Sequence, residues 1–206
     1  MRIAVYGASG MIGSAIATEA VRRGHEVTGI TRSGGTLPEG VAARPGDAGS
    51  ADDARAIAAE HDAVVSAIGP SRTQQDTGEF RAAIRTLADT LGSARLAVVG
   101  GAGSLLVDGQ RLVDSPDFPE AYRPESLVAA EALEDLRALP DGIDWTYLSP
   151  SPEIAPGPAT SGRTLGDDSP AGSSVTTGDF AVAIVDELEH PAHSRRRFTV
   201  ASGEQG

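Results

Sequence analysis

Three glycines at even spacing follow an apolar segment near the start of the chain. Residues 3–17, IAVYGASGMIGSAIA, pass from that segment through Gly7, Gly10 and Gly13 into alanine-rich sequence. Glycines after a first strand permit a tight turn, close approach of the backbone to a pyrophosphate, and close packing of a helix on a sheet. Their spacing differs by one residue from the G-x-G-x-x-G pattern, and a plain strand-to-helix turn is the alternative. Their place at the first strand-helix junction favours nucleotide binding.

The rest of the chain alternates short β-rich runs with longer helical patterns, the order typical of a doubly wound α/β sheet. We expect strands over residues 2–7, 25–32, 40–47, 62–69, 94–101, 144–150 and 196–201, and helices over residues 11–24, 51–61, 77–92, 125–139 and 176–190. Gly24 would close the first helix, Ser50 and Asp53 would cap the second, and Pro124 suits the first turn of the fourth. The prediction is a single Rossmann domain over residues 1–206, with a mostly parallel sheet and helices on both faces.

Two segments of this predicted domain stand out as substrate-side loops, at about residues 104–124 and 149–176. The second is rich in proline, glycine and serine. Regular helix and strand patterns follow it, so we interpret it as an active-site or substrate loop rather than as a linker.

The composition excludes several kinds of chemistry. The chain has no cysteine, and all 17 of its basic residues are arginine. Thiolate nucleophiles, cysteine-based metal sites and any mechanism that needs a lysine amine are therefore excluded. Beyond Glu187 and Glu189, His190 and His193 have no pattern of acidic neighbours, and we predict no metal site.

Charge and hydropathy limit the partners. The net charge of −12 disfavours nucleic acid, because neutralising phosphates needs a basic face. No apolar run approaches the roughly 18 residues of a membrane helix, and no signal-peptide pattern follows Met1. We expect a cytoplasmic protein with no membrane partner, either a monomer or a homodimer.

The end of the second predicted strand distinguishes between dinucleotides. An acidic residue there would hold a ribose 2′-hydroxyl, whereas an arginine accommodates a 2′-phosphate. The sequence places Arg32 and Ser33 at this point, and the nearest acidic residue, Glu39, lies further on. NADP(H) is favoured over NAD(H), which remains the alternative. A solvated surface arginine is the other interpretation of Arg32. Asp47, after the third predicted strand, is a candidate for the adenine edge or a turn residue.

Several segments, taken in order, resemble one known group of proteins. They are GASGMIG, RPGDAGS, HDAVVSAIGP, LAVVGGAGSLLV, LVDSPDFPEAYRPESLVAAEALEDLR, DWTYLSPS and FAVAIVDELEHPAHSRRRFTV. They look like the atypical short-chain dehydrogenases described as NAD(P)H-binding or NADH-flavin reductase-like proteins, relatives of biliverdin reductase B and NmrA-like proteins. The resemblance covers nearly the whole chain. It implies a single Rossmann domain with a small substrate region built from the C-terminal segments.

The resemblance also implies where the cofactor would make contact. Around the glycine turn and the next two strands the implied contacts are Gly7, Ser9, Gly10, Met11, Ile12, Arg32 and Asp47. Ala67, Ile68, Gly69 and Pro70 would follow the adenosine and ribose side, and Gly100, Gly101, Ala102, Gly103 and Ser104 would face the nicotinamide. Ser149 and Pro150, at the end of the sixth strand, are further candidates. Ser149 and Ser151 are expected to face the cleft, or only to end the strand. The segment SPSPEIAPG departs from the more apolar sequence of the group, so the resemblance implies least about the substrate side of the site.

Tyr122 and Ser104 are the catalytic candidates. An ordinary short-chain carbonyl reductase uses a tyrosine whose pKa is lowered by a lysine four residues on. Here Ser126 stands where that lysine would fall. Reduction of a flavin or quinone demands less, because the ring accepts hydride at one atom and protons can come from water. Tyr122 could lean over the nicotinamide or simply seal a loop onto the core, and Ser104 could orient a carboxamide or end a turn.

Two classes of function remain open at this stage. The first is an NAD(P)H-dependent oxidoreductase acting on a flavin, quinone or similar small aromatic acceptor. The second is an NmrA-like redox sensor that binds the dinucleotide without turnover. Sugar-nucleotide epimerisation or dehydration is a third, weaker reading, since the tyrosine-lysine pair is missing and the C-terminal region is short.

Overall fold

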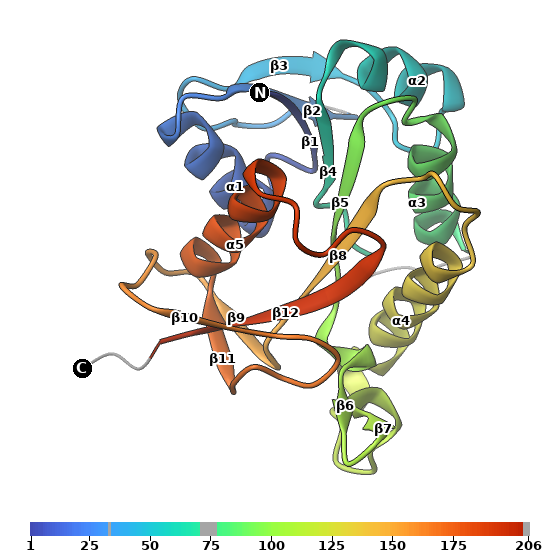
Figure 1. Ribbon diagram of the computed structural model, residues 1–206, viewed down its shortest axis with the longest axis vertical. Helices are drawn as coiled ribbons and strands as arrows, with labels where there is room; N and C mark the ends of the chain where they lie inside the picture. The colour runs from blue at the N-terminus through green and yellow to red at the C-terminus, as the bar shows by residue number, and fades with distance from the viewer. Residues whose placement is uncertain (33, 71–77, 204–206) are drawn as a thin grey trace.

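An eight-stranded sheet forms the centre of the computed structural model, which describes residues 1–32, 34–70 and 78–203 (Figure 1). Its strands are β1 (Arg2–Tyr6), β2 (Glu26–Thr31), β3 (Ala42–Pro45), β4 (Ala63–Ser66), β5 (Arg95–Val99), β8 (Trp145–Pro150), β10 (Arg163–Gly166) and β12 (Arg196–Ser202). The order across the sheet is β10-β12-β8-β5-β4-β1-β2-β3, and every neighbouring pair is parallel except β10 and β12. Strand order reverses between β1 and β4, which is where open sheets of this kind bind ligands.

Helices cover both faces of the sheet, so the predicted fold class is confirmed. The helices are α1 (Met11–Arg22), α2 (Ala51–Glu60), α3 (Glu79–Thr90), α4 (Arg123–Arg137) and α5 (Thr177–Glu189). One core cluster joins the sheet to α1 and α5, and the other joins it to α2, α3 and α4 (Figure 1). Alternate residues of the central strands β1, β4 and β5 supply the two clusters, because successive side chains point to opposite faces.

Local signals in the sequence fix several helix ends. Ser50 caps α2 by accepting a hydrogen bond from the Asp53 amide at 3.3 Å. Thr176 caps α5 in the same way at 3.0 Å, through the amide of Asp179. Gly24 follows α1 with a φ of +83°, a conformation that costs glycine little. The caps predicted at Gly24 and Ser50 are therefore confirmed.

Both predicted loop segments contain short regular elements that the sequence pattern does not show. The first holds the hairpin of β6 (Leu106–Val107) and β7 (Gln110–Arg111), together with the 3₁₀ turns η1 (Ala102–Ser104), η2 (Leu112–Asp114) and η3 (Glu120–Tyr122). The second holds β10, together with β9 (Glu153–Ala155), which pairs with β11 (Ser174–Thr176). Strands of two to four residues are too short for a period to emerge, and β10 pairs with a strand more than 30 residues away in sequence.

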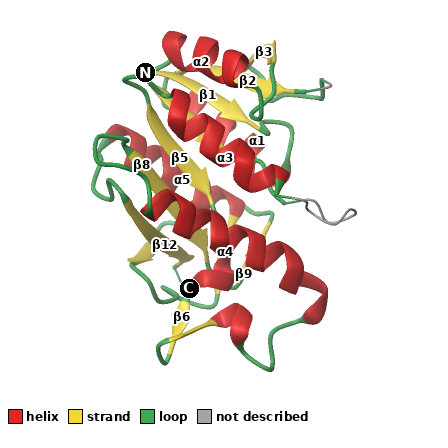
Figure 2. Cartoon of the chain, turned by 90° about the vertical axis from the view of Figure 1, so that its right-hand side faces the viewer, coloured by secondary structure: helices red, strands yellow, loops and turns green. Residues whose placement is uncertain are grey.

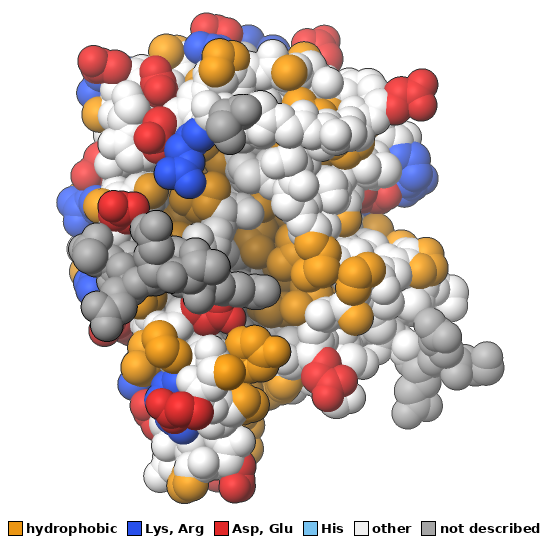
Figure 3. All heavy atoms as spheres, turned by 180° about the vertical axis from the view of Figure 1, so that it is seen from behind, with side chains coloured by type: hydrophobic (Ala, Val, Ile, Leu, Met, Phe, Trp, Pro, Cys, Tyr) orange, Lys and Arg blue, Asp and Glu red, His pale blue; other side chains and the backbone are white. Residues whose placement is uncertain are grey.

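The strands run toward one face of the molecule. In Figure 2 the arrows of β1 and β5 point to the right, which is the rear of Figure 1. Figure 3 views that rear face directly and shows a hollow near its centre, with hydrophobic side chains gathered around it. The carboxyl edge of the sheet therefore opens onto a hydrophobic hollow. No helix in the described ranges is long and apolar enough to cross a membrane.

Candidate dinucleotide-binding site

Two of the three glycines after β1 are needed by the fold itself. Gly7 has a φ of +77°, and a Cβ there would lie 2.6 Å from the carbonyl oxygen of Ala67. A Cβ on Gly13 would lie 2.2 Å from the carbonyl oxygen of Gly7. These contacts hold α1 close to the ends of β1 and β4, so the turn is tight for packing reasons alone.

Gly10 is different, because little in the chain crowds it. Its φ of −79° and ψ of 167° are extended, and an added Cβ would meet only the Gly7 carbonyl oxygen, at 3.3 Å. Gly10, Ser9 and Met11 are exposed, whereas Ile12 is half-buried. Gly10 caps α1 without any side-chain hydrogen bond, and the first turn of the helix carries no acidic residue. The positive end of the α1 dipole thus meets an open surface, as an anion site requires.

Arg32 lies at the end of β2 and is exposed. Most described arginines bind a carboxylate, as Arg44 binds Glu60 at 2.8 Å. Arg32 has no hydrogen bond or ion pair with any residue that the structure describes. Its guanidinium is therefore available to an anion. Ser33, the other residue predicted here, lies outside the described residues.

Asp47 makes a turn of its own. Its Oδ1 accepts a hydrogen bond from the Gly49 amide at 2.9 Å, and its amide donates to Asp53. The turn interpretation of Asp47 thus matches what its side chain does. It is exposed, so this hydrogen bond does not prevent contact with a ligand.

The sequence did not predict two buried hydroxyls at the point where strand order reverses. Tyr6 and Ser66 are register partners at the ends of β1 and β4, and the hydroxyl of each is buried with no hydrogen-bond partner among the described residues. Burial, followed by the negative charge of Asp53, raises the pKa of Tyr6 to about 12. An aromatic residue just before Gly7 was the only available signal. Unpaired buried polar atoms here fit a site that a polar ligand or water completes.

The segment after β4 lies against the glycine turn. Ala67, Ile68 and Pro70 are half-buried and Gly69 is exposed, with no atom of the described residues close to where its Cβ would be. Since Gly7 packs on the Ala67 carbonyl, the structure brings these two predicted parts of the site together.

The segment after β5 is held by the protein itself. The amide of Gly101 donates to the Tyr147 hydroxyl at 3.2 Å, so this amide already has a partner. Gly103 packs against Ser126, where a Cβ would lie 2.8 Å from that side chain. Gly100, Gly101 and Ala102 remain half-buried.

Three serines predicted as site residues lie inside the protein. Ser104 is buried, and its Oγ accepts a hydrogen bond from Nη1 of Arg197 at 3.0 Å. Ser149 is fully buried in β8 with Pro150 beside it, and its hydroxyl has no partner among the described residues. Ser151 is fully buried and donates to the Val200 carbonyl at 2.9 Å. The expectation that Ser149 and Ser151 face an open cleft is therefore wrong, because Ser149 is buried within β8 and Ser151 is buried against β12.

Tyr122 stands at the surface, with 55 % of its area exposed. It ends η3, directly before α4, and the described residues give its hydroxyl no hydrogen bond. The next residue, Arg123, donates to the carbonyls of Val113, Ser115 and Phe118, and its guanidinium lies 5.6 Å from the Phe118 ring centre. Arg123 therefore fixes the backbone that carries Tyr122 and leaves the ring itself free.

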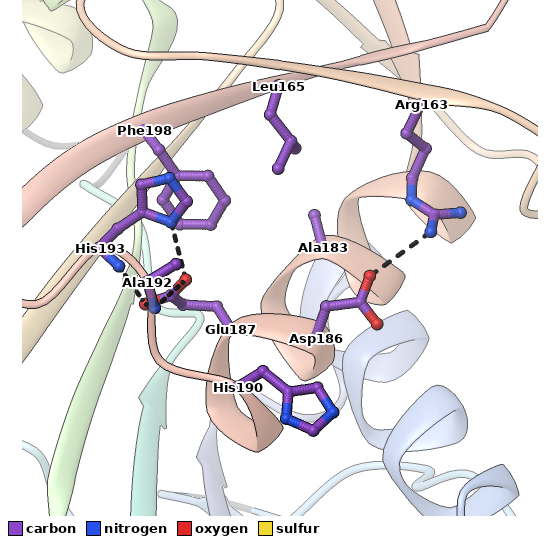
Figure 4. A pocket seen from close by; sticks show the side chains of 9 residues that line it. All are labelled: Arg163, Leu165, Ala183, Asp186, Glu187, His190, Ala192, His193 and Phe198. Atoms are coloured by element: carbon purple, nitrogen blue, oxygen red, sulfur yellow. Dashed lines mark hydrogen bonds and ion pairs between the residues drawn. The ribbon is translucent and has the colours of Figure 1, made fainter.

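One pocket among the described residues lies away from this edge, between α5, β10 and β12 (Figure 4). It has a volume of about 260 Å³ and includes His190 and His193. The Nδ1 of His193 bonds Glu187 at 2.7 Å, and its ring stacks on Phe198 at 4.2 Å. No group of three or more potential metal ligands occurs in the described ranges. We interpret the Glu187–His193 contact as a structural clamp at the end of α5.

Comparison with known proteins agrees with this geometry. The model of the family described as NAD(P)H-binding matches residues 7–191, from the glycine turn to just past α5. The chain belongs to the NAD(P)H-binding family. The uncharacterized protein YwnB of Bacillus subtilis is 41 % identical over 98 % of the chain and 99 % of its own length.

Solved structures of the family share the whole fold. A Streptococcus pneumoniae protein described provisionally as an NADH-flavin reductase is 34 % identical, with a TM-score of 0.87 over 98 % of this chain and 100 % of its own. A Bacteroides thetaiotaomicron protein described provisionally as an epimerase has the same identity and TM-score, over 100 % and 98 %. Two equally similar relatives thus carry different descriptions, and the reaction must be argued from the site.

Proposed function

We propose that this family member is an NADPH-preferring oxidoreductase that passes hydride to a flat aromatic acceptor such as a flavin or a quinone. The observation that carries the proposal is the hydrophobic hollow at the carboxyl edge of the sheet, in a chain that has no lysine to complete a proton-donating pair (Figure 3). A hollow of this kind suits a planar apolar ring better than a polar sugar.

The residues of the chain fit the cofactor. The open backbone at Gly10 and the uncapped start of α1 would take the pyrophosphate, and Arg32 would pair with a 2′-phosphate. Bound there, the dinucleotide would supply a hydride at its nicotinamide ring. The segment 100–104, fixed by Tyr147 and Arg197, would support that ring without moving.

Proton supply is the least demanding part of this reaction. A reduced flavin or quinone can take its proton from water, so the protein needs mainly to place two rings in contact. Tyr122 would pack over the acceptor as an aromatic cover. Ordering the acceptor would then provide most of the rate enhancement.

The test is to mix purified protein with NADPH and with FMN, riboflavin or a quinone, and to follow the loss of nicotinamide absorbance. Saturable oxidation with at least one acceptor is expected, and it should be slower with NADH. Tight NADPH binding with no oxidation across the acceptors would contradict the proposal and favour the sensor function. Turnover of a sugar nucleotide would favour the epimerase class instead.

A further inference from the structure

Nearly all the arginines of this chain are bound to carboxylates. Among the described residues, every arginine except Arg32 and Arg196 forms an ion pair with an aspartate or a glutamate. Arg196 begins β12 at the amino edge of the sheet and donates to the Ala192 carbonyl at 2.7 Å. Arg32 is the guanidinium that the proposed function assigns to the 2′-phosphate. Since the chain has no lysine, the described part of the carboxyl edge offers no free cation to a second anion.

The segment 104–124 is acidic and borders the hollow. It holds β6, β7 and the 3₁₀ turns at the foot of Figure 1, and it lies below the hollow in Figure 3. It contains four acidic residues and two arginines. Arg111 holds Asp114 through two hydrogen bonds, at 2.7 and 2.9 Å. Arg123 bonds Glu120 at 2.9 Å and three carbonyls of its own segment, so both guanidinium groups are already occupied.

The unpaired charges on the two substrate-side segments are negative. Segment 149–176 contains three acidic residues and a single arginine, Arg163, which pairs with Asp186 at 3.4 Å. Four exposed carboxylates of the two segments have no hydrogen bond or ion pair with any residue that the structure describes. They belong to Asp108, Asp117, Glu153 and Asp167. The two segments therefore present net negative charge to a molecule that approaches the hollow.

A bound cofactor would add to this negative charge. Its pyrophosphate would lie at Gly10 and its 2′-phosphate at Arg32, and one guanidinium neutralises only part of the charge on these groups. Charges of like sign repel one another over about 30 Å at 0.01 M ionic strength and over about 8 Å at 0.15 M. An anionic acceptor would therefore be repelled by the protein and by the cofactor, whereas a neutral ring would not.

We propose that the site selects a neutral acceptor, a flavin or quinone that carries no phosphate or carboxylate group. This inference rests on the proposed function and adds the charge class of its substrate. In the reaction, the C4–H bond of the dihydronicotinamide breaks, the hydrogen and two electrons pass to the acceptor ring, and the ring takes a proton from water. No step needs an anionic group on the acceptor, and the hollow offers apolar side chains to its ring (Figure 3).

Riboflavin and FMN test the proposal, because they share one ring and differ by a single phosphate. With saturating NADPH at about 0.01 M ionic strength, kcat/KM should be about tenfold or more higher for riboflavin than for FMN. The two values should converge as salt approaches about 1 M, where the Debye length is about 3 Å. An equal or higher value for FMN at low salt would overturn the proposal, and so would a ratio that salt leaves unchanged.

Charge reversal beside the hollow tests the cause of the selectivity. Asp117→Arg should raise kcat/KM for FMN by about threefold or more at low salt and leave the value for riboflavin unchanged. Glu26→Arg makes the same charge change at the exposed first residue of β2, at the amino edge of the sheet, and should alter neither value. Thermal unfolding checks that both variants fold. If the two variants give the same value for FMN, the charge of the segment does not select the acceptor and the proposal fails.

Arg72 is a further cation of the chain, and it lies outside the described residues. Arg72→Gln should leave the ratio of the riboflavin and FMN values unchanged. A preference for FMN that disappears in Arg72→Gln would reveal a phosphate site at this arginine and overturn the proposal.

Binding without turnover separates this proposal from the proposed reaction. Titration of each flavin with protein saturated with NADP⁺, followed by flavin fluorescence, compares the two affinities directly. Tighter binding of riboflavin without NADPH oxidation by any acceptor would support the selectivity and contradict the reaction. Equal binding of the two flavins, or binding of neither, would overturn the selectivity itself.

Discussion

Gly100 and Tyr147 fit together so closely that a Cβ on Gly100 would lie 1.9 Å from a ring carbon of Tyr147. The ring is fully buried in β8, and its hydroxyl donates to the Ala129 carbonyl at 2.9 Å while it accepts from the Gly101 amide. Burial, which outweighs that amide hydrogen bond, raises the pKa of Tyr147 to about 12, so the hydroxyl stays protonated. The glycine pair after β5 is therefore explained by packing as well as by any cofactor.

Gly100→Ala should destabilise the fold, because neither the sheet nor the buried ring can move away easily. We expect a loss of about 1–3 kcal/mol in the free energy of unfolding, the usual cost of overpacking. In a Tyr147→Leu background the same change should cost less by at least about 0.5 kcal/mol. Urea unfolding of the four proteins measures this coupling. Equal costs in both backgrounds would show that the tyrosine does not determine the need for glycine.

Gly10 and Gly13 should separate binding from folding. Gly13→Ala forces a Cβ onto the Gly7 carbonyl and should lower both the melting temperature and NADPH affinity. The backbone at Gly10 is extended and accepts a branched residue, so Gly10→Val should change the melting temperature by no more than a few degrees. Its side chain would stand where a pyrophosphate approaches, and NADPH binding and turnover should be lost together. Normal binding by Gly10→Val, measured by fluorescence titration, would place the cofactor elsewhere.

Arg32→Glu should weaken NADPH binding by about 10-fold or more, from the loss of a charge-assisted pair of roughly 1.5 to 3 kcal/mol. NADH binding should change much less. Arg55→Glu is the matched control, since Arg55 is an exposed arginine on α2 that pairs with Asp52. Calorimetric titration with each cofactor measures the difference. Equal weakening for both cofactors would mean that Arg32 does not recognise a 2′-phosphate.

Asp179 should make the stability of the fold depend on pH under acidic conditions. Burial opposes its ionisation, but hydrogen bonds from Ser202, Thr160 and Thr176 outweigh this and hold the pKa of Asp179 below 3.8. A lowered folded pKa gives stability that is present above pH 3.8 and lost as pH falls through the folded value. Asp179→Asn should therefore lower the free energy of unfolding by about 1–3 kcal/mol at pH 7. The difference from the unaltered protein should narrow below about pH 4.

Urea unfolding as a function of pH measures this difference in unfolding free energy directly. Asp89→Asn is a suitable control, because the exposed Asp89 pairs, among the described residues, only with Arg85 one helical turn away. That control should show almost no difference at any pH. A constant difference between pH 3 and 7 for Asp179→Asn would show that the ionised carboxylate is not what stabilises the start of α5.

Elements that carry a local signal could be predicted from the sequence. The turn at Gly7, the cap at Ser50 and the apolar run of each core strand depend on neighbouring residues, and each appears where the pattern indicated. Strand β10 could not be predicted, because its four residues are stabilised by β12 rather than by their own pattern. Local propensity yields to distant pairing in such strands.

The same distinction separates the parts of the candidate site. Arg32 and the glycines follow directly from position after a strand, so the spacing of the sequence places them correctly at the carboxyl edge. The state of Ser104 depends on Arg197, which lies 93 residues further along the chain. Nothing near Ser104 in sequence indicates that its hydroxyl is already bonded. Side-chain orientation at the end of a strand is decided by such distant partners.

Tyr122 provides the last test, which concerns how the acceptor receives its proton. Its ring is exposed, the described residues leave its hydroxyl unbonded, and the chain has no lysine to pair with it. Tyr122→Phe keeps the ring and removes the hydroxyl, so turnover with NADPH and a flavin or quinone should fall less than about 10-fold. Tyr122→Ala removes the ring as well and should raise the KM for the acceptor while NADPH binding stays normal.

Steady-state kinetics of both variants, with NADPH affinity measured separately, shows whether Tyr122 is an aromatic cover over the acceptor or a general acid. Loss of a true general acid would cost about 100-fold or more in kcat and would make the rate depend on its ionisation. If Tyr122→Phe abolishes turnover while NADPH still binds, Tyr122 is a catalytic acid that works without a lysine. If both variants behave like the unaltered protein, the acceptor does not contact Tyr122, and the hydrophobic hollow alone must hold it.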